Sequence, residues 1–422
     1  MLFNSYRTIP MQAKQVIWCR LMGSNNFIAD INPDSMEMET MMESRPSDNI
    51  NISKKNSTAP QNIYHQIFAG SWNVGGVSPP EVLDIQEWLR PNHINPPANI
   101  YVLGFQEIVP LNAANIVVRS ENRKICEKWN SLIRAALNDP DPKNNITQDF
   151  RCIISKQMVG ILLSVWVRSD LCQYIRQLSV SCVGCGLMGC LGNKGSVSVR
   201  FWLHETSFCF VCSHLASGGK EGDQRRRNAN AAEILSRTTF PPGPFPNFTT
   251  KILDHDRVIW LGDLNYRIYL PDATTQYLVE KQKWNLLLEY DQLKVELMEG
   301  HVFEGWHEGV INFAPSYKYY KNSELYFGCD EKRKHNKRRA PAWCDRIIWF
   351  GKGLKQNQYD RGELKLSDHR PVRAIFMAEI KVLRDPTGFQ SFLSDRIICL
   401  PNHFEECFND KYSCKWRSNF HY

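Results

Sequence analysis

The sequence has no apolar run long enough to cross a bilayer. Its longest strongly apolar stretch, Met158 to Val167, falls far short of the roughly 20 residues that a membrane-spanning helix needs, so it predicts a buried strand. The first ten residues, MLFNSYRTIP, lack the apolar core of a secretory signal. We therefore expect a cytoplasmic protein that is soluble or peripheral to a membrane, and a nuclear location stays open.

Strong net charge and a disulfide framework are also missing. The formal charge of +7 is too small to indicate bulk nucleic-acid binding, but it suits an anionic small molecule or an anionic membrane surface. The fourteen cysteines are scattered through 422 residues without an export signal, which favours reduced thiols. Cys182, Cys185 and Cys190 cluster, but no second pair or histidine follows at a ligand interval, so we expect buried thiols rather than zinc.

The composition divides the chain into three parts. Residues Asn32 to Asn62 are rich in Ser, Asn, Met and Glu without an apolar period, which predicts a linker. The preceding stretch, Gln15 to Ile31, fits either a short helix packed on the main domain or a disordered arm. We expect an N-terminal arm and linker at 1–63, one catalytic domain at 64–384 and a tail without motifs at 385–422.

Apolar runs that end in polar clusters recur from residue 64 onward. They predict buried strands, and the stretches between them with apolar residues three and four apart predict helices. The strand sequences are QIFAGSWNV, NIYVLGFQEI, VGILLSVWV, SVSVRFWL, SFCFVCSHL, RVIWLGDLN, CDRIIWF and VRAIFMAEI; the helical stretches are Glu81 to Leu89, Lys124 to Leu137, Asp223 to Arg237 and Thr274 to Met298. No internal repeat is visible. The pattern predicts an α/β fold of two packed sheets covered by helices.

Polar residues of the types used in catalysis stand at the ends of these strands, where they can converge on one rim. They are Asn73, Glu107, His214, Asp263, Asn265, Asp345, Asp368 and His369. No cysteine or serine lies beside a base in a nucleophile setting, so covalent catalysis is not indicated. Carboxylate and amide oxygens, such as those of Glu107 and Asn73, suit Mg²⁺. An aspartate near water, with histidines to neutralise phosphoryl oxygens, suits metal-assisted hydrolysis of a phosphate ester.

Eight motifs follow one another along the chain: SWNVGG, GFQEIVPLNAAN, GNKGSVSVRF, SHLASG, WLGDLNYRI, PSYKY, PAWCDRIIW and SDHRPV. With these motifs the chain resembles the inositol polyphosphate 5-phosphatases of the endonuclease/exonuclease/phosphatase superfamily. The resemblance covers residues 64 to about 384 in the order of the family's motifs, and the helix around KEGDQRRRNAN and the arm before residue 64 look most like the plant branch. This resemblance implies a four-layer α/β sandwich of two packed mixed sheets, similar to deoxyribonuclease I.

The resemblance also implies roles for the strand-end residues. Glu107 would hold Mg²⁺ with Asn73 nearby, and Asp263 would orient or deprotonate the attacking water. Asn265 would hold a phosphoryl oxygen, and His214 and His369 would stabilise the charge that develops on the phosphoryl group. Asp345 would fix the His369 ring, and Asp368 would support the metal or the water.

Substrate-binding positions follow from the same motifs. Lys194 would lie near a 1-phosphate, and a 4-phosphate would be held by Tyr317, Lys318, Lys337 and Arg339. The implied activity is magnesium-dependent removal of the 5-phosphate from inositol polyphosphates or phosphoinositides by direct attack of water, in signal termination and phosphoinositide turnover. We expect a monomer that binds the inositol phosphate headgroup and no nucleic acid.

Several alternatives stay open at this point. The basic run EKRKHNKRRA at 331–340 fits a phosphate clamp, a contact with anionic membrane or a nuclear localisation signal. A nuclease would share the metal and histidine machinery but would not need PAWCDR and PSYKY. A phosphoinositide-binding module without catalysis would not need a water-activating Asp263. The choice between a soluble and a lipid substrate is not decided by the sequence.

Overall fold

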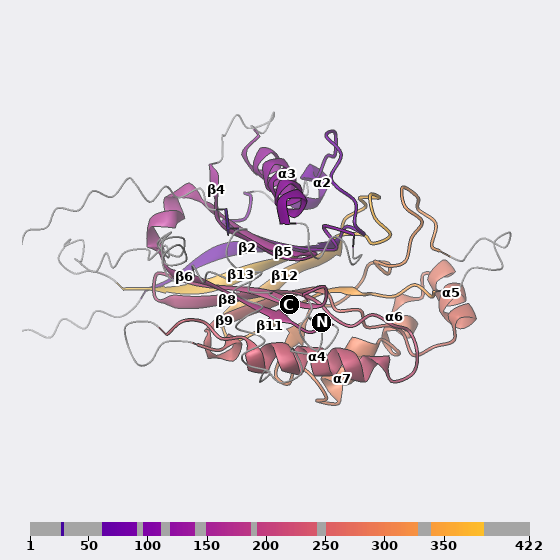
Figure 1. Cartoon of the computed structure of the whole chain (residues 1–422). Helices are drawn as coiled ribbons and strands as arrows, with labels where there is room; N and C mark the ends of the chain where they lie inside the picture. Colours follow the sequence, from indigo (N-terminus) through magenta and orange to yellow (C-terminus); the bar gives the residue numbers. More distant parts are fainter. Residues whose placement is uncertain are drawn as a thin grey trace, which may run out of the picture.

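Two β-sheets pack face to face, with helices on both outer sides (Figure 1). The computed structural model describes residues 27–28, 61–90, 96–110, 119–139, 149–186, 192–242, 250–327 and 339–383. The tail at 385–422, Lys337 and Cys190 lie outside these ranges, as does most of the N-terminal arm. The expected four-layer sandwich of two mixed sheets is confirmed.

The first sheet has seven strands among the described residues, and all its neighbours are antiparallel except β2 and β3. In spatial order they are β1 (Phe27–Ile28), β4 (Phe150–Met158), β5 (Ile161–Arg168), β3 (Ile100–Gln106), β2 (Gln61–Asn73), β13 (Val372–Val382) and β12 (Leu354–Arg361). The sequence predicted either a short helix or a disordered arm at 15–31. Phe27 and Ile28 instead form the short strand β1, which pairs with β4. Strand β2 begins three residues before the expected boundary at 64, because its first residues pair with the end of β13.

The second sheet has six strands in the described part of the chain, with β8 and β9 parallel and the other neighbours antiparallel. In spatial order they are β10 (His307–Glu308), β11 (Asp345–Phe350), β9 (Arg257–Asp263), β8 (Thr206–His214), β7 (Gly195–Leu203) and β6 (Ile175–Gly184). Each of the eight predicted strand sequences contains most of one strand of the two sheets. Among the described residues the prediction missed the two-residue strands β1 and β10 and the longer strands β4, β6 and β12. The run Met158 to Val167 is not one strand, because the chain turns at Val159 with a φ of 53°.

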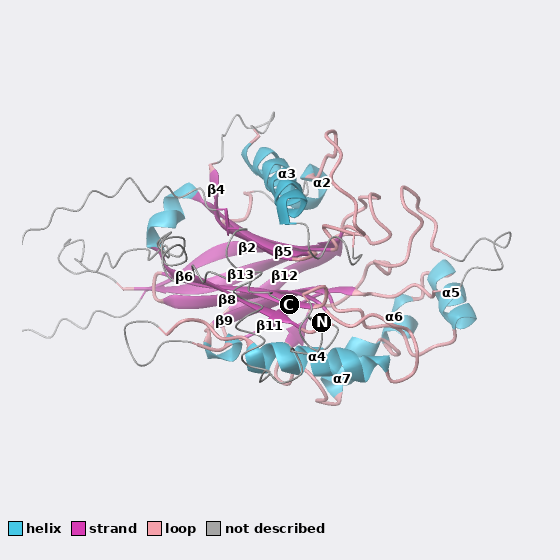
Figure 2. Ribbon diagram, in the orientation of Figure 1, coloured by secondary structure: helices cyan, strands magenta, loops and turns pink. Residues whose placement is uncertain are grey.

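The helices lie on the outer faces of the sheets or beyond the ends of the strands (Figure 2). Their bounds are α2 (Gln86–Leu89), α3 (Arg119–Asn138), α4 (Asp223–Arg237), α5 (Asp272–Glu280), α6 (Trp284–Leu288) and α7 (Gln292–Met298), with short 3₁₀ turns at Ser169–Tyr174 and Ile252–Asp254. The stretch Thr274 to Met298 is therefore three helices. Gln282 breaks it with a φ of 51°, and Asp291 caps α7 by accepting a hydrogen bond from the backbone N–H of Lys294. Only the last four residues of Glu81 to Leu89 are helical.

Apolar layers hold the sandwich together. Helices α2 and α3 cover the first sheet with an aromatic cluster that includes Trp72, Trp88 and Trp129, while α4 and α7 cover the second sheet. Between the sheets, Gly104 allows a close approach, because a Cβ there would lie 2.3 Å from Leu261 Cδ1 and 2.7 Å from Cys212 Sγ. Among the described residues, no helix is long and apolar enough to cross a membrane.

The cysteine prediction needs one correction. The cysteines in the described ranges are all free thiols, which agrees with a reduced state. Cys182 and Cys185, however, are half-buried rather than buried, because they lie on or just after the edge strand β6.

Two parallel strand pairs decide where the polar residues meet. Asn73 ends β2 and is in register with Gln106 at the end of β3, one residue before Glu107. His214 ends β8 and is in register with Asp263 at the end of β9. The carboxyl ends of both pairs thus bring these side chains to one rim of the sandwich.

Candidate active site

Asp263 is the centre of the polar cluster at this rim. It is buried, and its register partners are His214 on one side and Asp345 at the start of β11 on the other. One carboxylate oxygen, Oδ2, lies 3.2 Å from Nε2 of His214 and accepts a hydrogen bond of 2.9 Å from Nδ2 of Asn73. The other oxygen accepts a hydrogen bond of 3.0 Å from the backbone N–H of Asn265.

Glu107 stands beside this centre and is more open to solvent. Its side chain is 31% exposed, and its Oε1 lies 3.8 Å from His214 Nε2. Asn73 Nδ2 donates to the same oxygen at 3.3 Å, so Asn73 joins the carboxylates of Glu107 and Asp263. The carboxylates of Glu107 and Asp263 supply the oxygen donors that a hard divalent cation prefers, whereas Asn73 turns its Nδ2 toward them and its Oδ1 accepts a hydrogen bond of 3.0 Å from the backbone N–H of Gly75. The residues present therefore fit a divalent cation.

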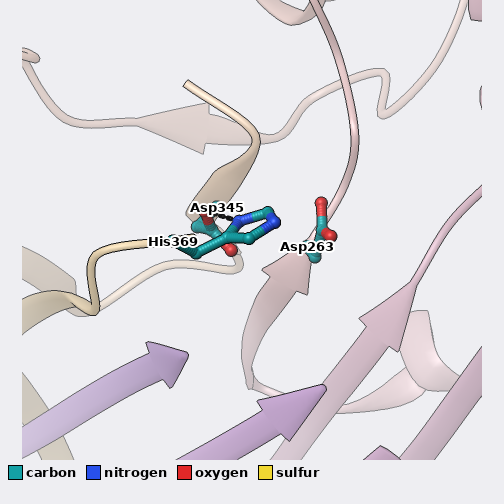
Figure 3. Close-up of side chains that lie close together, drawn as sticks. All are labelled: Asp263, Asp345 and His369. Atoms are coloured by element: carbon teal, nitrogen blue, oxygen red, sulfur yellow. Dashed lines mark hydrogen bonds and ion pairs between the residues drawn. The ribbon is translucent and has the colours of Figure 1, made fainter. Parts of the chain in front are cut away.

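Asp345 and His369 form a second buried pair (Figure 3). Asp345 Oδ2 lies 2.8 Å from Nδ1 of His369 and accepts a hydrogen bond of 2.7 Å from the hydroxyl of Ser316. The ring of His369 faces toward Asp263 in Figure 3. Ligand atoms of Asp263, Asp345 and His369 lie within 4.8 Å of one another. Because Nδ1 of His369 is already bound to Asp345, we interpret this trio as a proton-sharing pair beside a carboxylate rather than as metal ligands.

Burial and charge set the protonation states of this pair and of Asp263. Burial alone would raise the pKa of Asp263, but His214 and the other positive groups outweigh it and hold the pKa far below its usual range. Burial alone would lower the pKa of His369, but the Asp345 carboxylate raises it to about 10. Asp263 is thus a carboxylate and His369 an imidazolium at neutral pH.

Lys194 and Asn265 complete the inner rim. Nζ of Lys194 and Nε2 of His214 form a hydrogen bond. Burial lowers the pKa of Lys194 to about 8, although Asp263 and Glu107 act in the opposite direction. Asn265 is buried, adopts a φ of 59° and donates from Nδ2 to the carbonyl oxygen of Leu215 at 3.2 Å.

A group of aromatic and basic residues lies next to His369. The ring of Tyr317 packs on the His369 ring with a centroid distance of 4.5 Å, and its hydroxyl accepts a hydrogen bond of 2.8 Å from Nη1 of Arg339. Lys318 Nζ donates to Asp368 Oδ2 at 2.5 Å. Lys318 and Asp368, which the sequence predicted as site residues, therefore lie at the same site. Burial would raise the pKa of Asp368, but His369 and Lys318 lower it.

The structure thus brings together every sequence-predicted site residue that it describes. Two neighbours that the sequence did not single out are Ser316, which holds Asp345, and Arg267, whose Nη2 donates to Asn265 Oδ1 at 2.6 Å. Both belong to recognised motifs, PSYKY and WLGDLNYRI, so their place in those motifs was the available signal.

Comparisons with known proteins agree with this geometry. The model of the endonuclease/exonuclease/phosphatase family 2 matches residues 70–375. The type IV inositol polyphosphate 5-phosphatase 9 of Arabidopsis thaliana is 55% identical over 92% of this chain and 95% of that protein. The type I inositol polyphosphate 5-phosphatase 8 of the same plant is 48% identical over 77% of this chain and 74% of that protein.

A solved structure supports the same assignment. The inositol polyphosphate 5-phosphatase domain of SPsynaptojanin, in complex with inositol (1,4)-bisphosphate and a calcium ion, matches with a TM-score of 0.66 and 33% identity, over 77% of this chain and 87% of that domain. The fold, the rim and these relatives lead to one conclusion: the chain belongs to the inositol polyphosphate 5-phosphatase family and is a phosphoric monoester hydrolase.

Proposed function

We propose that this enzyme is a magnesium-dependent phosphatase that removes the 5-phosphate from inositol 1,4,5-trisphosphate and from phosphoinositides of the 4,5-bisphosphate and 3,4,5-trisphosphate class. The observation that carries the proposal is the convergence of Asp263 with Asn73, Glu107 and His214 at one rim, next to the Asp345 and His369 pair. The relative bound to inositol (1,4)-bisphosphate supports it, since that molecule is the 1,4,5-trisphosphate without its 5-phosphate.

Glu107, together with Asn73, would hold the magnesium ion. Bound Mg²⁺ supplies positive charge that neutralises phosphoryl oxygens and lowers the cost of a negatively charged transition state. The related 5-phosphatase domain was solved with calcium, which also prefers oxygen donors.

In the proposed reaction Asp263 orients a water molecule and accepts its proton as the water oxygen bonds to phosphorus. The bond from phosphorus to the inositol C5 oxygen breaks, and the leaving oxygen takes up a proton from solvent, to which Asp263, whose pKa is held low, releases the proton that it accepted. Direct attack is supported by the thiols near the rim: Cys212 and Cys344 are fully buried, and burial raises the pKa of Cys212 to about 12. Neither thiol is a competent nucleophile under these conditions.

The remaining rim residues would stabilise the phosphoryl group. His369 is held as an imidazolium by Asp345, so it places a positive charge beside Asp263 without a protonation step during the reaction. His214 and the amide of Asn265 would donate to phosphoryl oxygens. Asp368 would support the metal or the water, as the sequence motif implies.

Substrate recognition would use the basic and aromatic residues outside this centre. Lys194 would bind the 1-phosphate, while Tyr317, Lys318 and Arg339, with Lys337 from the same motif, would bind the 4-phosphate. Lys318 is paired with Asp368, so a 4-phosphate would compete with this carboxylate for the ammonium. Charge-assisted hydrogen bonds make such contacts strong and directional.

The test is phosphate release, measured with malachite green, from a panel of soluble inositol phosphates and of phosphoinositide vesicles. The panel includes isomers without a 5-phosphate, each with Mg²⁺ and with a chelator, and cleavage of a DNA substrate is followed on a gel, because cutting a phosphodiester releases no inorganic phosphate. We expect release only from 5-phosphorylated compounds and only with the metal. A folded wild-type protein that releases phosphate from none of them would refute the proposal.

An Asp263→Asn variant tests the water-activating role. The amide cannot accept the proton, so we expect kcat to fall by about 10²- to 10⁴-fold while KM changes little. Comparable turnover by this variant and the wild type would remove Asp263 from that role. The same panel compares soluble and vesicle substrates, and preference for vesicles would support a peripheral contact with anionic membrane.

A further inference from the structure

The amide of Asn265 has a defined orientation. Its Oδ1 accepts a hydrogen bond of 2.6 Å from Nη2 of Arg267, and its Nδ2 donates to the Leu215 carbonyl oxygen at 3.2 Å. A guanidinium group can only donate and a carbonyl can only accept, so these two partners decide which end of the amide is oxygen. The amide group has a second N–H, which is left for another acceptor at the rim.

Arg267 is itself held from two directions. Its backbone N–H donates to Oε1 of Gln292 at 2.8 Å, and the same oxygen accepts a hydrogen bond of 2.6 Å from the buried Arg227. Its guanidinium lies over the ring of Tyr317, with Cζ 4.4 Å from the ring centroid. The backbone and the side chain of Arg267 are therefore both held in place, so the guanidinium that donates to Asn265 has a fixed position.

The charge of Arg267 makes its direct contacts with uncharged groups. In the described ranges no carboxylate lies within ion-pair distance of this guanidinium, although the Asp263 carboxylate acts on it at longer range; its side-chain contacts are the neutral Asn265 amide and Tyr317, whose ring it covers and to which it also hydrogen-bonds. A charged donor at Oδ1 draws electron density from the amide and makes its N–H groups stronger donors. Asn265 therefore presents a polarised donor, next to the Asp263 carboxylate that accepts from its backbone N–H.

We propose that Arg267 is a positioning residue of the 5-phosphatase reaction, which acts through Asn265 by orienting and polarising the amide N–H that meets the phosphoryl group. This inference rests on the proposed function. The stacking on Tyr317 requires a planar group, so lysine would not replace arginine here. Tyr317 also packs on the ring of His369, so the guanidinium of Arg267 links the amide of Asn265 to the ring pair of Tyr317 and His369.

A double-mutant cycle tests the proposal. Arg267→Met, Asn265→Ala and the double variant are compared with wild type for kcat and KM on soluble inositol 1,4,5-trisphosphate with Mg²⁺. If Arg267 acts through Asn265, Arg267→Met lowers kcat by about 10- to 100-fold with KM changed less than about threefold, and it has almost no further effect when Asn265 is already alanine. Arg226→Met, which removes a guanidinium from an exposed position on α4, is the matched control and should keep wild-type rates.

Three results would overturn the inference. Additive losses in the double variant would show that the two residues act separately. A rise in KM alone would make Arg267 a direct substrate ligand, and wild-type kinetics of Arg267→Met would remove it altogether. If Arg267→Met does not fold, the cycle is run with Arg267→Lys, which keeps the charge and loses the planar stack. The proposed function fails separately, because in that case the wild type itself would release no phosphate.

Discussion

Replacement of Asp345 by asparagine should move the pH range of activity. In the folded enzyme the Asp345 carboxylate, 2.8 Å from His369 Nδ1, raises the pKa of His369 to about 10 against the opposing effect of burial. The imidazolium is thus present at all pH values below that pKa and is lost only as the pH rises through it. An asparagine side chain would have nearly the same shape but no charge, so the pKa of His369 would fall toward its ordinary value of 6.5, with burial lowering it and the Asp263 and Asp368 carboxylates still raising it.

The size of the effect follows from this shift. With a pKa of 6.5, about 3% of His369 would be charged at pH 8, so the rate would fall by up to about 30-fold, or about 2 kcal/mol of transition-state stabilisation. At pH 5.5 most of the imidazolium would return and the loss would shrink to the contribution of orientation alone. The alkaline limb of the profile should therefore move down by up to about three pH units, which is about the difference between the two pKa values.

The assay is the initial rate of phosphate release from soluble inositol 1,4,5-trisphosphate between pH 5.5 and 9.5 at saturating Mg²⁺. Ser316→Ala is the matched control, because it removes the hydrogen bond to Asp345 but keeps the carboxylate charge, so its profile should keep the wild-type alkaline limb. Thermal melting checks that each variant is folded. If Asp345→Asn lowers the rate by one constant factor across the whole range, the charge of Asp345 does not control His369 and the reasoning fails.

Three further changes test the packing and the recognition of substrate. Arg346→Met leaves the buried carboxylate of Asp291 and the largely buried carboxylate of Glu308 without the guanidinium that donates to them at 2.8 and 2.7 Å. The free energy of unfolding in urea should fall by about 3–5 kcal/mol, and a loss below about 1 kcal/mol would contradict this. Gly104→Ala forces a methyl group against the side chains of the opposite sheet and should lower the free energy of unfolding by about 1–3 kcal/mol in the same measurement. Unchanged stability would mean that the two sheets move apart there without cost. Lys318→Met should raise KM for inositol 1,4,5-trisphosphate about 10-fold but leave the 1,5-bisphosphate unaffected, because only the former has a 4-phosphate; equal effects on both would exclude Lys318 from that subsite.

The strands that the sequence predicted are those with continuous apolar runs, such as β3 and β9. Every residue of these two strands is buried, because one face meets the other sheet and the opposite face meets helices. The missed strands β6 and β12 lie at sheet edges, where most residues are only half-buried and the pattern resembles that of a loop. The stretch Thr274 to Met298 was wrongly predicted as one helix, because the apolar spacing continues across Gln282 although the backbone there leaves the helix.

The sequence alone determined which chemical groups are available, since strand-end acids, amides and histidines indicate metal-assisted hydrolysis, and the ordered motifs indicate the family. Only the tertiary structure decided which of these groups meet. Asn73 and Asp263 are 190 positions apart and become hydrogen-bonded because two parallel strand pairs end at one rim. In the same way, the hydrogen bonds between Asp345 and His369 and between Arg267 and Asn265 exist only in the folded chain. Such contacts depend on sheet register and on packing between the two sheets, and these are set by the whole core rather than by any local run of residues.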